Sequence, residues 1–112
     1  MKYLLLIYMG ENAMDETERQ HCYIESTQLA HDLHSAGQFL SCNPLHPVST
    51  ATSVRIREGK RLVTDGPFAE TKEQIGGLFV TTLPDLDEAI RIAALIPTAE
   101  TGSLEIRPIV ER

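Results

Sequence analysis

Residues 53–64 read SVRIREGKRLVT and contain the clearest local pattern in the chain. Apolar residues alternate with polar or charged ones over residues 53–57, and residues 60–64 form a second run of charged and β-branched residues. Glu58-Gly59 separates the two runs, and a two-residue connection that ends in glycine is typical of a tight hairpin turn. The stretch therefore predicts a β-hairpin, and its alternation predicts one face turned to solvent.

The chain before the hairpin predicts a strand, a helix and a second strand. Residues 3–9 are an unbroken apolar run, too short for a typical helix, and predict a central strand buried on both faces that residues 10–12 end. An amphipathic helix is expected from about Asp15 to Ala36, and Gly37 stops it. Its inward stripe consists of Cys22, Ser26, Leu29, Leu33 and Ala36. Residues 39–42 predict the short second strand.

The chain after the hairpin predicts a strand, a helix and a last strand. Residues 78–82 predict the strand, and Asp85 and Glu88 predict a capping box at the start of the helix. The inward stripe of this helix is expected to be Leu86, Ala89, Ile90 and Ala93. Residues 104–107 predict the last strand, which Pro108 restricts to an edge or end position.

The predicted order is β, α, β, hairpin, β, α, β in a single domain over residues 1–112. Without the hairpin this is the α+β, ferredoxin-like split βαβ arrangement, with two helices on one face of a sheet. No segment remains to cover the opposite face of the sheet. We therefore expect a second copy of the chain to cover it in a homodimer.

Composition and charge exclude several classes of protein. The chain has 10 Lys and Arg against 16 Asp and Glu, and a net charge of −6 argues against nucleic acid as a partner. No apolar run is long enough to span a membrane, and the opening residues lack a small-residue cleavage site. Cys22 and Cys42 form no CxxC pair, which favours two reduced thiols and a cytoplasmic location.

Residues 63–77, VTDGPFAETKEQIGG, resemble the DGPF branch of the YCII-related family. The likeness extends over about residues 1–110 and implies a dimeric α+β barrel in which two sheets pack face to face. It also implies acid–base chemistry on a small molecule through a His–Asp pair in a cleft. Asp65 matches the family's aspartate, whereas Ser26 stands near the position where the family's helix histidine is expected.

Asp65 is the predicted catalytic residue, although the segment at 65–68 has two interpretations. One is structural: an Asx-type turn with an unusual backbone angle at Gly66 and with Phe68 in the core. The other places Asp65 at the mouth of a pocket as a proton acceptor, a role that requires partial burial. The two roles are compatible.

Five further residues are predicted to bind the ligand. Glu70, Lys72 and Glu73 lie in a polar loop that precedes a predicted Gly76-Gly77 hinge, although a charged loop is also commonly just solvated. The other two are His46 and Arg107. His46 lies between two prolines, where a kinked loop can present it to a cleft, although it is equally interpreted as an exposed loop histidine. Arg107 can bind a carboxylate bidentately from the last strand.

Metal and cofactor chemistry receive little support from the sequence. His31 and His34 have a spacing that permits joint ligation, but no other ligand completes a set, so no metal site and no cofactor are predicted. The arginines of the hairpin are expected to pair with Glu58 or with a partner subunit.

Two functions without catalysis are the alternatives. Many DGPF members are encoded beside extracytoplasmic-function sigma factors, so the first alternative is an accessory or regulatory protein associated with such a factor. The second is a dimer module with no chemistry of its own.

Overall fold

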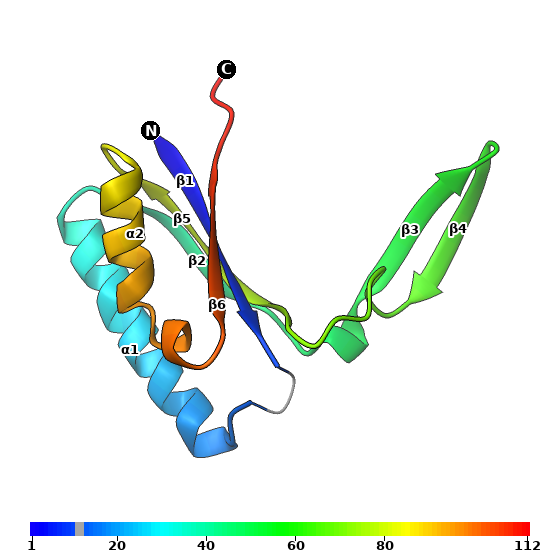
Figure 1. Cartoon of the computed structure of the whole chain (residues 1–112), viewed down its shortest axis with the longest axis horizontal. Helices are drawn as coiled ribbons and strands as arrows, with labels where there is room; N and C mark the ends of the chain where they lie inside the picture. The colour runs from blue at the N-terminus through cyan, green and yellow to red at the C-terminus, as the bar shows by residue number, and fades with distance from the viewer. Residues whose placement is uncertain (11–12) are drawn as a thin grey trace.

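A computed structural model describes residues 1–10 and 13–112 and has an α+β fold (Figure 1). Residues 11 and 12, which were expected to end the first strand, lie outside the described residues. The elements in chain order are β1 (Lys2–Met9), α1 (Glu16–Ser35), β2 (Phe39–Pro44), η1 (Val48–Thr50), β3 (Thr52–Arg57), β4 (Lys60–Asp65), β5 (Gln74–Thr82), α2 (Leu86–Leu95), η2 (Pro97–Glu100) and β6 (Ser103–Pro108).

The main sheet has four strands in the order β2-β5-β1-β6, and every neighbouring pair is antiparallel. β5 lies between β1 and β2, which makes the first βαβ unit a split one. Both helices lie on the same face of this sheet (Figure 1). The predicted architecture of two helices, an antiparallel sheet and a separate hairpin is therefore confirmed.

The core lies between the sheet and the helices. Alternate side chains of β1, including Leu5 and Ile7, are buried there with Leu33 of α1 and Ile92 of α2. The intervening side chains of β1 are only half-buried, because both helices pack on the other face. The expectation that β1 is buried on both faces is therefore wrong for a single chain.

The ends of α1 follow from its sequence. The Asp15 carboxylate accepts from the Glu18 amide at 2.8 Å, and the Glu18 side chain accepts from the Asp15 amide at 3.4 Å, which is a capping box. Gly37 has a φ of 73° after the helix ends, as the sequence predicted. Of the helices in the described residues, none combines the length and the apolar composition needed to cross a bilayer.

α2 differs from its prediction in two details. Asp85 accepts from the Glu88 amide at 2.9 Å, but the Glu88 side chain binds Arg91 and does not reach back to Asp85. The buried residues are Ala89, Ile92 and Ala93, whereas Leu86 and Ile90 are about half exposed. Because α2 is apolar around much of its circumference, packing on the sheet and not the sequence pattern selects the inward face.

β3 and β4 form the predicted hairpin, which we call the arm. Glu58 and Gly59 both have positive φ, 52° and 74°, as in a type I′ turn. The arm extends away from the main sheet (Figure 1), in a molecule that measures 47 × 41 × 18 Å.

Both faces of the arm are exposed. Val54, Ile56 and Val63 share one face by their register and are each 59% exposed, while Arg55 and Arg57 lie on the other. The prediction of a single solvent-facing side is therefore wrong for one chain, since none of the other helices and strands over residues 1–10 and 13–112 lies against the arm (Figure 1).

Candidate functional site

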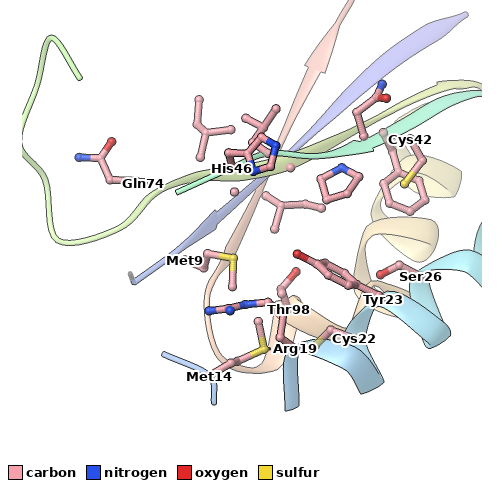
Figure 2. Close-up of a pocket in the computed structure, with 18 of the residues that line it drawn as sticks. Met9, Met14, Arg19, Cys22, Tyr23, Ser26, Cys42, His46, Gln74 and Thr98 are labelled. Atoms are coloured by element: carbon pink, nitrogen blue, oxygen red, sulfur yellow. Dashed lines mark hydrogen bonds between the residues drawn. The ribbon is translucent and has the colours of Figure 1, made fainter. Parts of the chain in front are cut away.

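A cavity of about 510 Å³ lies between α1 and the sheet, and we call it the α1 pocket (Figure 2). Its lining is mainly apolar and includes Met9, Met14, Cys22, Tyr23, Phe39 and Leu45. The polar side chains in the lining are Arg19, Ser26, Thr27, Asn43, His46, Gln74 and Thr98. An apolar concavity with a few polar groups is the usual form of a small-molecule site.

The helix wall of the pocket comes from one stripe of α1. The lining residues at positions 19, 22, 23, 26, 27 and 30 are separated by three or four residues, or are adjacent, so they share one helix face. Ser26, near the position where the family's histidine was expected, is half-buried in this wall. The predicted inward stripe contained Cys22 and Ser26, and extending it one turn toward the N-terminus would have included Arg19.

The wall opposite α1 includes two glycines of β5, where neighbouring groups approach the backbone closely. A Cβ atom on Gly76 would lie 2.6 Å from Met9 Sδ, and one on Gly77 would lie 3.2 Å from the Asn43 carbonyl oxygen. The register between β1 and β5 shifts after Ile7, which leaves Gly76 in a bulge. These glycines belong to β5, which begins at Gln74, so the predicted Gly76-Gly77 hinge before a strand at 78–82 is wrong.

Thr98 of η2 contributes a buried polar group. Its side chain is 7% exposed, and within the described part of the chain its Oγ1 has no hydrogen-bond partner. Buried hydroxyls in proteins are usually paired, so an unpaired one beside a cavity is a group that a water molecule or a polar ligand atom could satisfy. Thr98 had no distinguishing signal in the sequence, because only the tertiary fold brings η2 to the pocket.

Sulfur-containing residues form a polarisable part of the pocket lining. Cys22 Sγ lies 3.3 Å from Met14 Sδ. Burial raises the pKa of the thiols of Cys22 and Cys42, which favours their protonated, weakly nucleophilic forms. Thioethers and thiols of this kind adapt to irregular apolar surfaces.

The predicted histidines have separate environments. His46 is exposed in the loop after β2 and lines the α1 pocket. His34 packs edge-on against Phe39 with ring centroids 6.4 Å apart. Within residues 1–10 and 13–112, no three His, Cys, Asp or Glu side chains gather in an arrangement that could hold a metal ion.

Asp65 lies at the root of the arm, opposite Thr52, and does not line the α1 pocket. It is exposed, and the following turn is held by two bonds of Gly66. The Gly66 amide donates to the Ala51 carbonyl and the Ser53 hydroxyl donates to the Gly66 carbonyl, both at 2.7 Å. Gly66 has a φ of 98°, as the turn interpretation required, but Phe68 is 78% exposed and is not in the core.

The loop residues predicted to bind ligand lie outside the pocket. Glu70 and Lys72 are exposed. Glu73 is half-buried, and its Oε1 accepts from the Ser103 hydroxyl at 3.0 Å, which fastens the loop to β6. Among the described residues of one chain, none of these three therefore joins His46 in the lining of the pocket.

Arg107 belongs to a polar cluster on the sheet face that the helices leave open. Its Nε donates to Glu105 at 2.6 Å, and Glu105 also forms a hydrogen bond with Tyr8. The bond to Arg107 and then the bond to Tyr8 lower the pKa of Glu105, and the bond to Glu105 raises the pKa of Tyr8.

Comparison with known proteins agrees with the resemblance of the sequence. The chain is similar to an uncharacterized protein of Rhizobium meliloti (strain 1021), with 33% identity over 114 residues that cover 97% of this chain and 92% of that protein. Residues 1–112 match the family model described as the YCII-related domain. With the whole chain matched, this protein belongs to the YCII-related family.

Proposed function

We propose that this YCII-related protein binds a small organic molecule in the α1 pocket. The observation that supports the proposal is the cavity itself. Its volume of about 510 Å³ is within the range of small-molecule sites, and its apolar walls carry a few polar groups that can orient a ligand. His46, predicted from the sequence, is one of those groups.

A homodimer is the second part of the proposal. Leu4 and Leu6 of β1 and Val80 of β5 point away from the helices and form a half-buried apolar patch. It lies beside the polar cluster of Arg107, on the sheet face that no helix of the described chain covers. A two-stranded ribbon such as the arm is also marginal in water by itself. A second copy would cover both surfaces through one symmetric interface.

Charge favours the same partner. Residues 52–65 contain four of the ten Lys and Arg, namely Arg55, Arg57, Lys60 and Arg61, in a chain of net charge −6. The part of a second copy outside its arm is negatively charged and would therefore attract the basic arm electrostatically.

Acid–base chemistry at Asp65 depends on this dimer. In a single chain Asp65 is exposed, and a fully solvated carboxylate is a poor general base near neutral pH. A partner packed against the arm would shield the root of the arm from water. The proposed catalytic role of Asp65, with Glu70, Lys72, Glu73 and Arg107 around it, therefore belongs to the assembled protein.

A thermal-shift screen tests the pocket. A specific ligand raises the melting temperature of the wild-type protein by mass action. Ala30→Phe would fill the pocket from α1, and Ala94→Phe adds the same side chain on the exposed face of α2 as a control. We expect hits to stabilise wild type and Ala94→Phe but not Ala30→Phe. Hits that bind Ala30→Phe as tightly as wild type would contradict the pocket.

The same hits should bind Asp65→Asn with unchanged affinity, since Asp65 does not line the pocket of its own chain. Any chemical conversion of a hit should be lost in that variant. If Asp65→Asn still converted the hit, Asp65 would not be a catalytic residue.

Analytical ultracentrifugation tests the dimer. Wild type should sediment with twice the 12.5 kDa mass of one chain. Leu6→Asp should produce monomers, and Leu86→Asp, which changes a 52% exposed residue on the helix side, should not. A monomeric wild type would exclude the homodimer.

A further inference from the structure

We propose that the molecule bound in the α1 pocket is an organic anion, with an apolar body and a carboxylate. The inference rests on the proposed function and adds the chemical class of the ligand. Among the described residues that line the pocket, Arg19 is the one with a permanent charge, and none is an aspartate or glutamate. The chain as a whole has 16 acidic residues and a net charge of −6, so the charge in the pocket lining is opposite in sign to the net charge of the chain.

Arg19 is placed to bind an anion. Figure 2 shows its side chain leaving α1 and extending between Met9 and Met14 at one end of the pocket. A guanidinium has five N–H donors in a planar fork that matches the two oxygens of a carboxylate. One donor, on Nη1, contacts Glu16 at 3.1 Å, and further donors remain for a ligand.

The contact with Glu16 does not compete strongly with a ligand. The side chains of Arg19 and Glu16 are 41% and 71% exposed, and an ion pair in such a setting contributes little to stability. A ligand carboxylate beside the apolar wall would be less hydrated than Glu16 and would bind the guanidinium more strongly.

Thr98 indicates a second polar group on the ligand. Its Oγ1 is more than nine-tenths buried and lacks a partner in the described part of the chain. The hydroxyl points toward the side of the pocket that Tyr23 lines (Figure 2). A hydroxyl or carbonyl oxygen on the apolar body of the ligand would satisfy it.

Isothermal titration calorimetry at low salt tests the anion directly with two probes of equal shape. The probes are 2-naphthoate, which is an anion, and 2-naphthamide, which is neutral. We expect the Kd of wild type for 2-naphthoate to be at least about tenfold lower than for 2-naphthamide, because charge-assisted hydrogen bonds to arginine require the carboxylate.

Matched variants assign the preference to Arg19. Arg19→Gln should abolish the preference for 2-naphthoate, and Arg19→Lys, which keeps the charge but not the fork, should retain part of it. Arg91→Gln is the control, because Arg91 forms an i,i+3 pair with Glu88 like that of Arg19 with Glu16 but lies outside the pocket. The control should bind both probes as wild type does.

The outcomes separate the two proposals. If neither probe binds at millimolar concentration, the pocket is not a small-molecule site and both proposals fail. If both probes bind equally, or if Arg19→Gln keeps the preference, the pocket stands and the anion inference alone is overturned.

Discussion

Leu5 of β1 and Phe79 of β5 lie directly opposite each other, and neither side chain has exposed surface. The pair connects the two central strands on the face that the helices cover. One residue along, Leu4 and Val80 form the equivalent pair on the other face and are half-buried. The two pairs illustrate how one chain buries one side of its sheet completely and leaves the other side partly exposed.

Phe79→Ala should therefore reduce the free energy of unfolding by about 3–5 kcal/mol, through lost burial and the cavity left behind. Urea denaturation followed by circular dichroism measures the change. Leu95→Ala, at a position that is 54% exposed, should cost less than about 0.5 kcal/mol. Similar losses at the two positions would mean that Phe79 is not in the core.

Gly102→Ala should destabilise the chain through its backbone. A Cβ atom at this position would lie 2.1 Å from the Tyr8 carbonyl oxygen, and main chain cannot move aside as a flexible side chain can. We expect a loss of about 3 kcal/mol or more in thermal or urea unfolding.

Gly37→Ala is the comparison for Gly102→Ala. Gly37 has a φ of 73° but nothing within 4 Å of an added Cβ, so only the conformational cost of about 1–2 kcal/mol should appear. An equal loss at both glycines would argue against the close approach of Gly102 to β1.

Thr98→Val should stabilise the ligand-free protein by about 1 kcal/mol. Valine has the same shape, and it removes a buried hydroxyl that lacks a partner in the described chain. Equilibrium unfolding measures the gain. A destabilised variant would indicate instead that the hydroxyl has a hydrogen-bond partner when no ligand is bound.

Glu105→Gln should change how stability depends on pH. The pKa of Glu105 is lowered in the folded chain, so its ionised form stabilises the protein fully above the usual glutamate pKa of about 4.5. That contribution is lost as the pH falls through the folded-state pKa. The difference in unfolding midpoint between wild type and Glu105→Gln should therefore shrink from pH 7 to pH 3.

Tyr8 provides a direct readout of the same cluster. Its pKa is raised by the hydrogen bond to Glu105, so Glu105→Gln should lower it, as measured by a carbon-13 NMR titration of tyrosine ring carbons. Glu100→Gln, an exposed carboxyl on η2, should leave it unchanged. An unchanged titration of Tyr8 in Glu105→Gln would contradict the hydrogen bond.

Much of the fold could be predicted because its signals are local. The hairpin over residues 53–64, the end of α1 at Gly37 and the edge position of β6 before Pro108 each depend on a few neighbouring residues. The start of β5 was missed by four residues because glycines weaken a strand pattern, and its pairing with β1 and β2 overrides that weakness.

The candidate site was much less predictable. Of the six residues proposed from the sequence, only His46 lines the α1 pocket, and Asp65 is carried away from it on the arm. Arg19 lies one turn before the predicted inward stripe of α1, so extending that stripe would have identified it as a pocket residue. Nothing in the sequence distinguishes Thr98, because its importance comes from neighbours far away along the chain.

The sequence by itself determined the order of the elements, the caps of α1, the turn of the arm and the membership of the YCII-related family. These features are encoded by short-range propensity and by residues in fixed local patterns. Only the tertiary structure decided which face of α2 is buried and where the α1 pocket lies. Both depend on packing between segments distant in sequence, and hydrophobic packing is non-directional, so a local pattern does not specify its result.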